Sequence, residues 1–147
     1  MRALRKLLAL SGYDRILIVS TAAALSGIWI GLRLFPFGKV LETVDRLSTR
    51  VSPRKSGSRW GPDRIVWAVL AVSRYSPLSF SCLVQALAAK ITLSRQGYPV
   101  IVRIGVAPTD GGPLRAHAWL EYNGRIVIGD KCREGFRPLP CFDRGQY

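Results

Sequence analysis

The stretch AHAWLEYNGRIVIGD, residues 116–130, constrains the fold more than any other part of the chain. Asn123 and Gly124 lie between two runs rich in apolar and β-branched residues, and both tolerate the positive φ angles that a two-residue hairpin loop requires. If these two residues form the loop, the register of the hairpin pairs His117 with Asp130 further along the ladder. Opposed side chains lie on one side of a sheet, so the sequence predicts an antiparallel hairpin with an oriented His-Asp pair.

Two helices are expected before this hairpin. Pro62 suits the first turn of one helix, because a proline there loses no intrahelical hydrogen bond. The other helix begins near Cys82, with Ser79 or Ser81 as its N-cap, and ends before Gly97. Helices followed by antiparallel strands indicate the α+β fold class.

The remaining C-terminal segments alternate between strand and irregular patterns. Residues 100–106 are rich in β-branched side chains and predict a strand, whereas residues 107–114 hold prolines and glycines and predict a loop. Residues 131–147 contain prolines and show no hydrophobic period, so they predict an irregular tail.

The chain divides into three parts. Residues 1–47 are predicted to form an N-terminal helical region, a docking or membrane-proximal segment. Residues 48–62 concentrate serine, proline, glycine and arginine, which predicts a linker. Residues 63–147 form the third part, the domain that carries the hairpin.

An uncharged, apolar run spans residues 16–32 and is bounded by Arg15 and Arg33. It is at the lower limit for a membrane-spanning helix and contains glycines and small polar residues. We therefore expect a packed or interfacial helix rather than a span. The net charge of +13 is concentrated toward the N-terminus and favours an acidic peptide, an anionic membrane or nucleic acid as partner.

The order of a cysteine, a histidine and an aspartate along the chain, at Cys82, His117 and Asp130, predicts a catalytic site. A helix N-terminus presents unpaired N–H groups and a positive dipole end, which favour the thiolate of Cys82 over the thiol. An imidazole from His117 would strengthen that effect, and Asp130 would hold the imidazole in one tautomer. The alternative for Cys82 is the role of a small buried apolar residue, which a cysteine at a helix start plays more often.

Two other interpretations come from different function classes. A zinc site of three cysteines and one histidine would collect Cys82, His117, Cys132 and Cys141, but the close paired spacing usual in such sites is absent. A basic, non-enzymatic binding module needs no thiol, yet no nucleic-acid-binding motif is recognisable. The odd number of cysteines favours a reducing compartment, with Cys132 and Cys141 as structural thiols.

The residues of these motifs resemble a known family over about residues 60–130. A Cys-Leu pair opens a helix at Cys82, a strand contains Ile104-Gly105-Val106, and Ala-His-Ala-Trp at 116–119 leads to Asp130. Together they resemble the leader peptidase of lasso-peptide biosynthesis, a transglutaminase-like cysteine peptidase. Leu34-Phe35-Pro36-Phe37 also resembles the leading segment of its stand-alone form.

This resemblance implies a papain- or transglutaminase-like core, in which a helix bearing Cys82 packs on an antiparallel sheet bearing His117 and Asp130. It implies cleavage of the leader from a ribosomally made precursor, with these three residues as the catalytic set and with no cofactor or metal. The implied partners are the precursor peptide, a leader-recognition protein and an ATP-dependent lasso cyclase that closes the macrolactam. A cytoplasmic location is expected, with no nucleic-acid partner, and membrane association is the less favoured alternative.

Three further residues have expected roles near this site. Trp119 and Glu121 share a face of the strand with His117, so Trp119 is expected in the core or a pocket wall. Glu121 lies two ladder pairs from His117, which leaves Asp130 as the better orienting group. Papain-type enzymes carry a glutamine upstream of the cysteine that is missing here; Gln85 is expected on a solvated face, with the oxyanion hole as its alternative.

Overall fold

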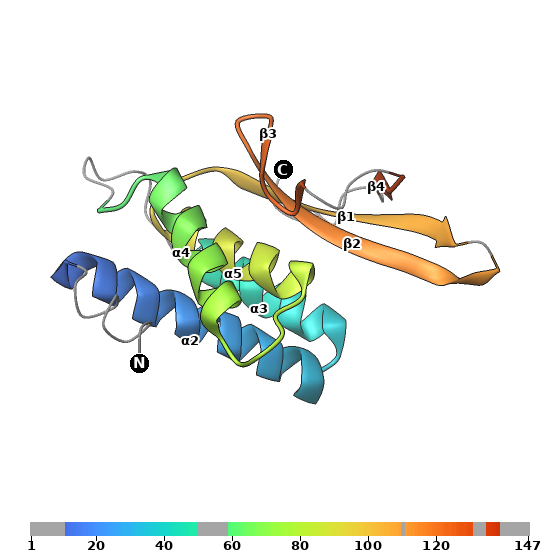
Figure 1. Ribbon diagram of the computed structural model, residues 1–147, viewed down its shortest axis with the longest axis horizontal. Coiled ribbons are helices and arrows are strands. Elements are labelled where there is room, and N and C mark those ends of the chain that lie inside the picture. Colours follow the sequence, from blue (N-terminus) through green and yellow to red (C-terminus); the bar gives the residue numbers. More distant parts are fainter. Residues whose placement is uncertain (1–10, 50–58, 110, 131–134, 139–147) are drawn as a thin grey trace.

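The computed structural model describes residues 11–49, 59–109, 111–130 and 135–138. In this part of the chain, helices precede an antiparallel sheet (Figure 1), as expected for an α+β fold. The helices are α2 (Gly12–Leu34), α3 (Phe37–Thr49), α4 (Pro62–Tyr75) and α5 (Cys82–Arg95). The strands are β1 (Val100–Thr109), β2 (Gly112–Tyr122), β3 (Arg125–Ile128) and β4 (Arg137–Pro138), in the order β3-β2-β1-β4.

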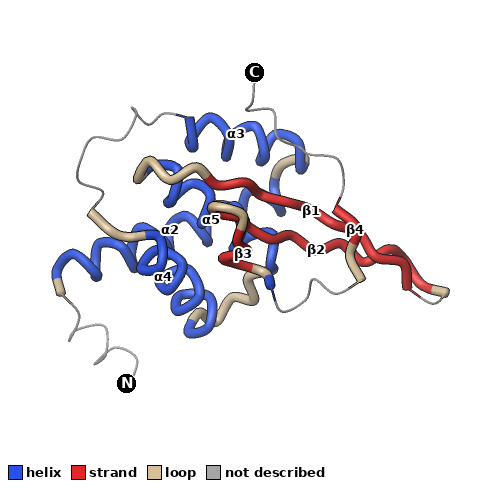
Figure 2. The backbone as a smooth tube through the Cα atoms, turned by 90° about the horizontal axis from the view of Figure 1, so that it is seen from above, coloured by secondary structure: helices blue, strands red, loops and turns tan. Residues whose placement is uncertain are grey.

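Helix α5 is the centre of the molecule. It packs on β1 and β2, and the other three helices pack around it (Figure 2). Half of its residues are buried: Val84, Ala86, Leu87, Ala88, Ala89, Ile91 and Leu93. The alanines allow its neighbours to approach closely, and burial on several sides explains why α5 lacks a single apolar stripe.

The sheet is covered by the helices on one face. On that face Ala118 and Leu120 of β2, together with Ile128 of β3, join the core formed by the helices. Because side chains alternate along a strand, the neighbouring residues His117 and Trp119 lie on the other face.

The long helix α2 packs only one of its sides. Leu17, Leu25 and Ile28 are buried against the domain, and a bidentate ion pair joins Asp14 to Arg64 of α4. By length and composition α2 would also suffice to cross a membrane, and only 22% of its most apolar window is buried. The expectation that residues 16–32 form a packed or interfacial helix rather than a span stays a prediction.

Helices α4 and α5 confirm the predicted boundaries. Pro62 occupies the first turn of α4. Ser81, rather than Ser79, is the N-cap of α5, and Gly97 follows that helix with a φ of 84°.

Two predictions for the strand region are wrong. The loop expected over residues 107–114 is much shorter, because β1 continues to Thr109 and β2 begins at Gly112. The ladder passes Pro108 through a register shift between Ala107 and Thr109, an irregularity that tolerates a missing N–H. In the tail predicted as irregular, β4 pairs with Gly105 and Val106 of β1.

The three-part division stays a prediction. Most of the linker expected over residues 48–62 lies outside the described residues. Helices from residues 1–47 and elements from residues 63–147 contribute to one hydrophobic core, so the two parts are packed together in the structure.

Candidate active site

Cys82 is the first residue of α5 and is held there by local hydrogen bonds. The Ser81 hydroxyl accepts from the Val84 backbone N–H at 3.4 Å, which caps the helix. The Gln85 side-chain amide donates to the Phe80 carbonyl at 3.0 Å. This bond fixes the turn that enters α5, so Gln85 is partly buried and structural rather than on a solvated face.

The Cys82 side chain is a free, half-buried thiol that packs against the hydrophobic core. As the first residue of the helix it lies where backbone N–H groups have no intrahelical acceptor. These groups favour an anion, whether a thiolate or the oxyanion of an acyl intermediate. The position therefore meets the first requirement for a thiol nucleophile.

The hairpin loop is as predicted. Asn123 and Gly124 have φ angles of 49° and 74°, and Tyr122 pairs with Arg125. Only residues that tolerate the left-handed region suit such a loop, so the Asn-Gly pair predicted the loop correctly.

The predicted pairing of His117 with Asp130 is wrong. The register shifts between Glu121 and Leu120 of β2. Leu120 pairs with Ile128, and β3 ends at that pair. The shift is a bulge in β3, which moves the residues after it by one position relative to β2. His117 consequently lies beyond the end of β3, and on the other side it pairs with Gly105 of β1.

His117 is instead held by the main chain after β3. Its Nε2 lies 2.7 Å from the Gly129 carbonyl oxygen. Gly129 has a φ of 89°, and a Cβ there would lie 2.7 Å from the Ala118 carbonyl oxygen. Glycine is therefore required for the approach that brings this carbonyl to the imidazole.

That contact determines the protonation pattern of the neutral ring. A carbonyl oxygen only accepts hydrogen bonds, so Nε2 must carry the proton and donate it. Nδ1 of His117 is then the nitrogen with a free lone pair, the form that a general base requires.

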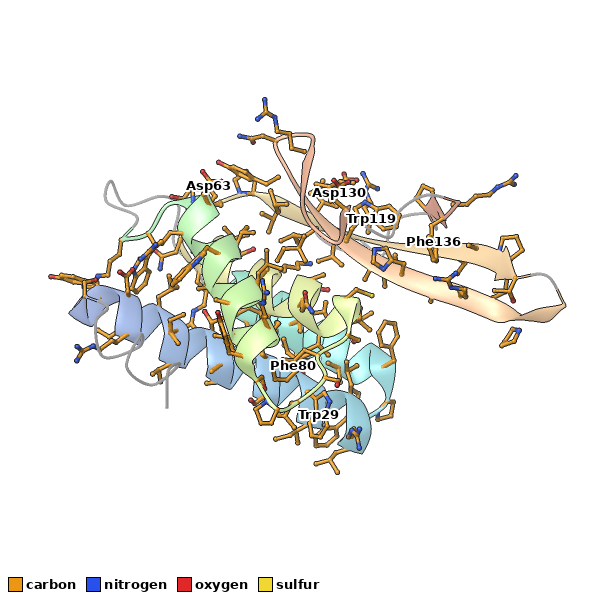
Figure 3. The ribbon with its side chains drawn as sticks, viewed as in Figure 1. Trp29, Asp63, Phe80, Trp119, Asp130 and Phe136 are labelled. Atoms are coloured by element: carbon orange, nitrogen blue, oxygen red, sulfur yellow. The ribbon has the colours of Figure 1, made fainter. Side chains whose placement is uncertain are left out.

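Aromatic rings surround the imidazole on its face of the sheet. The ring centroid of Trp119 lies 6.2 Å from that of His117, in a stacked arrangement, and that of Phe136 lies 5.3 Å away. His117 is only 7% exposed. Figure 3 shows Trp119 and Phe136 on the side of the sheet away from the helices, whereas Phe80 lies among the helices. The sequence did not indicate Phe136, because it belongs to the tail without a hydrophobic period.

The structure does not bring the three predicted catalytic side chains into contact. Cys82 belongs to the helix layer, and His117 faces away from that layer. Among the described residues no hydrogen bond joins either of them to Asp130, which is exposed and follows Gly129 directly. The portion of β2 that contains His117 pairs with β1 on one side and has no β3 residue paired with it among the described residues.

Glu121 has other partners on the outer face of the sheet. It accepts a hydrogen bond from Trp119 Nε1 at 2.9 Å and lies 3.5 Å from Arg103 Nε. Glu121 therefore has partners other than His117, and the Trp119 side chain is buried, with only 3% exposed.

No group of three or more potential metal ligands occurs among the described residues. The alternative zinc site also requires Cys132 and Cys141, which lie outside them.

Comparison with known proteins gives one match. The family model described as the transglutaminase-like superfamily matches residues 30–141, which is more than half of the chain and includes Cys82, His117 and Asp130. Neither the curated proteins nor the solved structures give a match.

Proposed function

Because the chain belongs to the transglutaminase-like superfamily, whose members are generally cysteine peptidases or transglutaminases, we propose that it is a thiol peptidase. The observation that carries this proposal is the free thiol of Cys82 at the capped start of α5, inside the matched region. In this proposal Cys82 is the nucleophile and His117 is the general base. Asp130 is the carboxylate that stabilises the imidazolium.

The chemical steps follow those of other thiol peptidases. The Cys82 thiolate attacks the scissile carbonyl, the C–N bond breaks, and the amine leaves with a proton from the His117 imidazolium. Water then hydrolyses the thioester, and the acid product and the free thiol result. The Cys82 backbone N–H is the oxyanion donor that this geometry offers.

This chemistry requires the thiol and the imidazole to meet. His117 lies beyond the last pair of β2 and β3, so in this proposal the imidazole and Cys82 approach each other past the end of β3. The lone pair on Nδ1 is the one that would receive the thiol proton, since Nε2 is engaged by Gly129.

The substrate that we propose is the leader region of a lasso-peptide precursor. The support is the motif resemblance: the Cys-Leu helix start at Cys82, and Ala-His-Ala-Trp leading to Asp130. In this proposal the chain works in the cytoplasm with a leader-recognition protein, and an ATP-dependent cyclase closes the ring on the new core N-terminus. The neighbouring genes should then encode a short precursor, a small leader-binding protein and an asparagine-synthetase-like cyclase.

A cleavage assay with that precursor and recognition protein tests the assignment. Cys82→Ala should abolish leader release, and His117→Ala should lower its rate by roughly 10²- to 10⁴-fold, the usual contribution of a general base. Asp130→Asn should lower the rate less. Cys132→Ala and Cys141→Ala are the matched controls and should cleave normally. Normal cleavage by His117→Ala would contradict its role as base, and cleavage by Cys82→Ala would contradict a thiol peptidase.

A further inference from the structure

One side of α2 is exposed along the whole helix and carries no charge. This outer α2 face consists of Ile16, Val19, Ala23, Gly27, Ile30 and Leu34. Their spacing of three or four residues places them on one side of the helix, opposite the side that packs on the domain. Val19 and Leu34 are 68% and 70% exposed, which is costly for apolar side chains that have no partner.

The apolar surface continues beyond α2. Phe35 and Phe37, in the connection to α3 and at its start, are also exposed. A groove of about 730 Å³ lies between α2 and α3, and Ile91 of α5 contributes to its lining. Ile16 and Val19 extend past the groove, so a partner seated in the groove would leave part of the outer α2 face uncovered.

The charges around this surface are positive. The acidic residues of α2 and α3 are each paired with a cation, as Asp14–Arg64, Glu42–Arg46 and Asp45–Lys90. Lys39 and Arg95 line the groove, and Arg33 lies 4.2 Å above the Trp29 ring. Among the described residues none of these three cations is paired with an acid, so the surface would attract an anionic partner.

We propose that the outer α2 face docks on an anionic membrane surface. The helix would lie in the plane of the interface, with its uncharged side toward the acyl chains and the flanking cations at the lipid phosphates. An extended apolar plane covers the entire outer α2 face, which a partner in the groove does not. Most of this face also precedes residue 30, where the family match begins, so it lies outside the matched region.

The same contacts argue for docking and against crossing the membrane. To span a bilayer, α2 would have to withdraw Leu17, Leu25 and Ile28 from the core and break the ion pair between Asp14 and Arg64. A helix that lies on the surface keeps all of these contacts.

Vesicle flotation of the full chain tests this docking. The wild type should float with vesicles of phosphatidylcholine and phosphatidylglycerol but not with phosphatidylcholine alone, and salt should weaken the binding. The double variant Val19→Glu/Leu34→Glu should bind on the order of tenfold less. Leu114→Glu is the matched control, since Leu114 is 69% exposed but lies at the start of β2. Thermal unfolding should show that all variants fold.

Three outcomes would overturn the proposal. The first is a wild type that does not float with the anionic vesicles, which would leave a protein partner to cover the surface. The second is a double variant that floats as well as Leu114→Glu. The third is a wild type that resists alkaline carbonate extraction from cell membranes, which would mean that α2 spans the bilayer.

Discussion

At the level of single residues, Gly129 decides which nitrogen of His117 carries a proton. The Gly129 carbonyl accepts from Nε2, and the positive φ of this glycine allows that approach. Asp130 follows it in the chain, and its side chain is exposed. In this account the carbonyl sets the tautomer, and the carboxylate stabilises the positive charge that forms during catalysis.

The imidazole nitrogen spectrum of the protein tests this division of roles. His117 is the only histidine in the chain, so its ¹⁵N signals need no assignment. The wild type and Asp130→Asn should both show the proton on Nε2. Gly129→Ala should shift the tautomer balance toward Nδ1–H, because its Cβ would collide with Ala118 and displace the loop.

Gly111→Ala is the control for backbone strain in this measurement. Gly111 also has a positive φ, 75°, but a Cβ there meets no atom within 4 Å. Both alanines should cost roughly 1–3 kcal/mol from the strained φ, and only Gly129→Ala should change the tautomer. A proton on Nδ1 in the wild type would contradict the role of Gly129.

Residue patterns in the sequence identified the parts of the site but not their contacts. Asn123-Gly124 predicted the loop, and Ser81 was one of the two predicted N-caps for the helix that begins at Cys82. The prediction that His117 faces Asp130 was wrong, because a bulge shifts the register and no local sequence pattern marks that bulge. A glycine just before a predicted catalytic aspartate was the one available signal for the Gly129 contact.

At the level of elements, an ion pair ties the start of α2 to α4. Arg64 and, to a lesser extent, the Ser11 hydroxyl donate hydrogen bonds to the Asp14 carboxylate and hold its pKa below the usual value. A carboxyl group with a depressed pKa stabilises the fold above its unfolded pKa, and this contribution is lost as pH falls through the folded pKa.

Asp14→Asn should therefore lower the thermal unfolding midpoint slightly at pH 7, because the pair is near the surface. The difference from wild type should shrink below about pH 4, where the unfolded carboxyl group begins to bind a proton, and vanish in stronger acid. Glu42→Gln is the control, since its partner Arg46 lies on the same helix and joins no other element. A difference that persists undiminished in acid would show that Asp14 acts through its shape rather than its charge.

Local sequence signals predicted the helices better than the outer strands. Pro62 and Ser81 marked helix starts because capping depends on neighbouring residues alone. The short strand β4 pairs with β1 across more than thirty residues of chain, and such a nonlocal pairing leaves no hydrophobic period in a two-residue strand.

At the level of the whole molecule, the sheet separates two environments. The helices cover one face and hold Cys82, whereas His117 and Trp119 are buried on the other beside Phe136. The proposed peptidase requires the Cys82 thiol and the His117 imidazole, which lie in different environments, to come into contact. Alternation along β2 could be predicted from the sequence, but the sequence did not indicate which face α5 covers.

The central claim of the proposed function is that Cys82 is the nucleophile and that His117 reaches it, and alkylation by iodoacetamide at about pH 6.5 tests it most directly. Peptide mass spectrometry of the singly labelled chain reports which of the three cysteines reacts first. Cys82 should react ahead of Cys132 and Cys141, and labelling of Cys82 should be markedly slower in His117→Ala. Equal labelling of all three thiols, or an unchanged rate in His117→Ala, would contradict it.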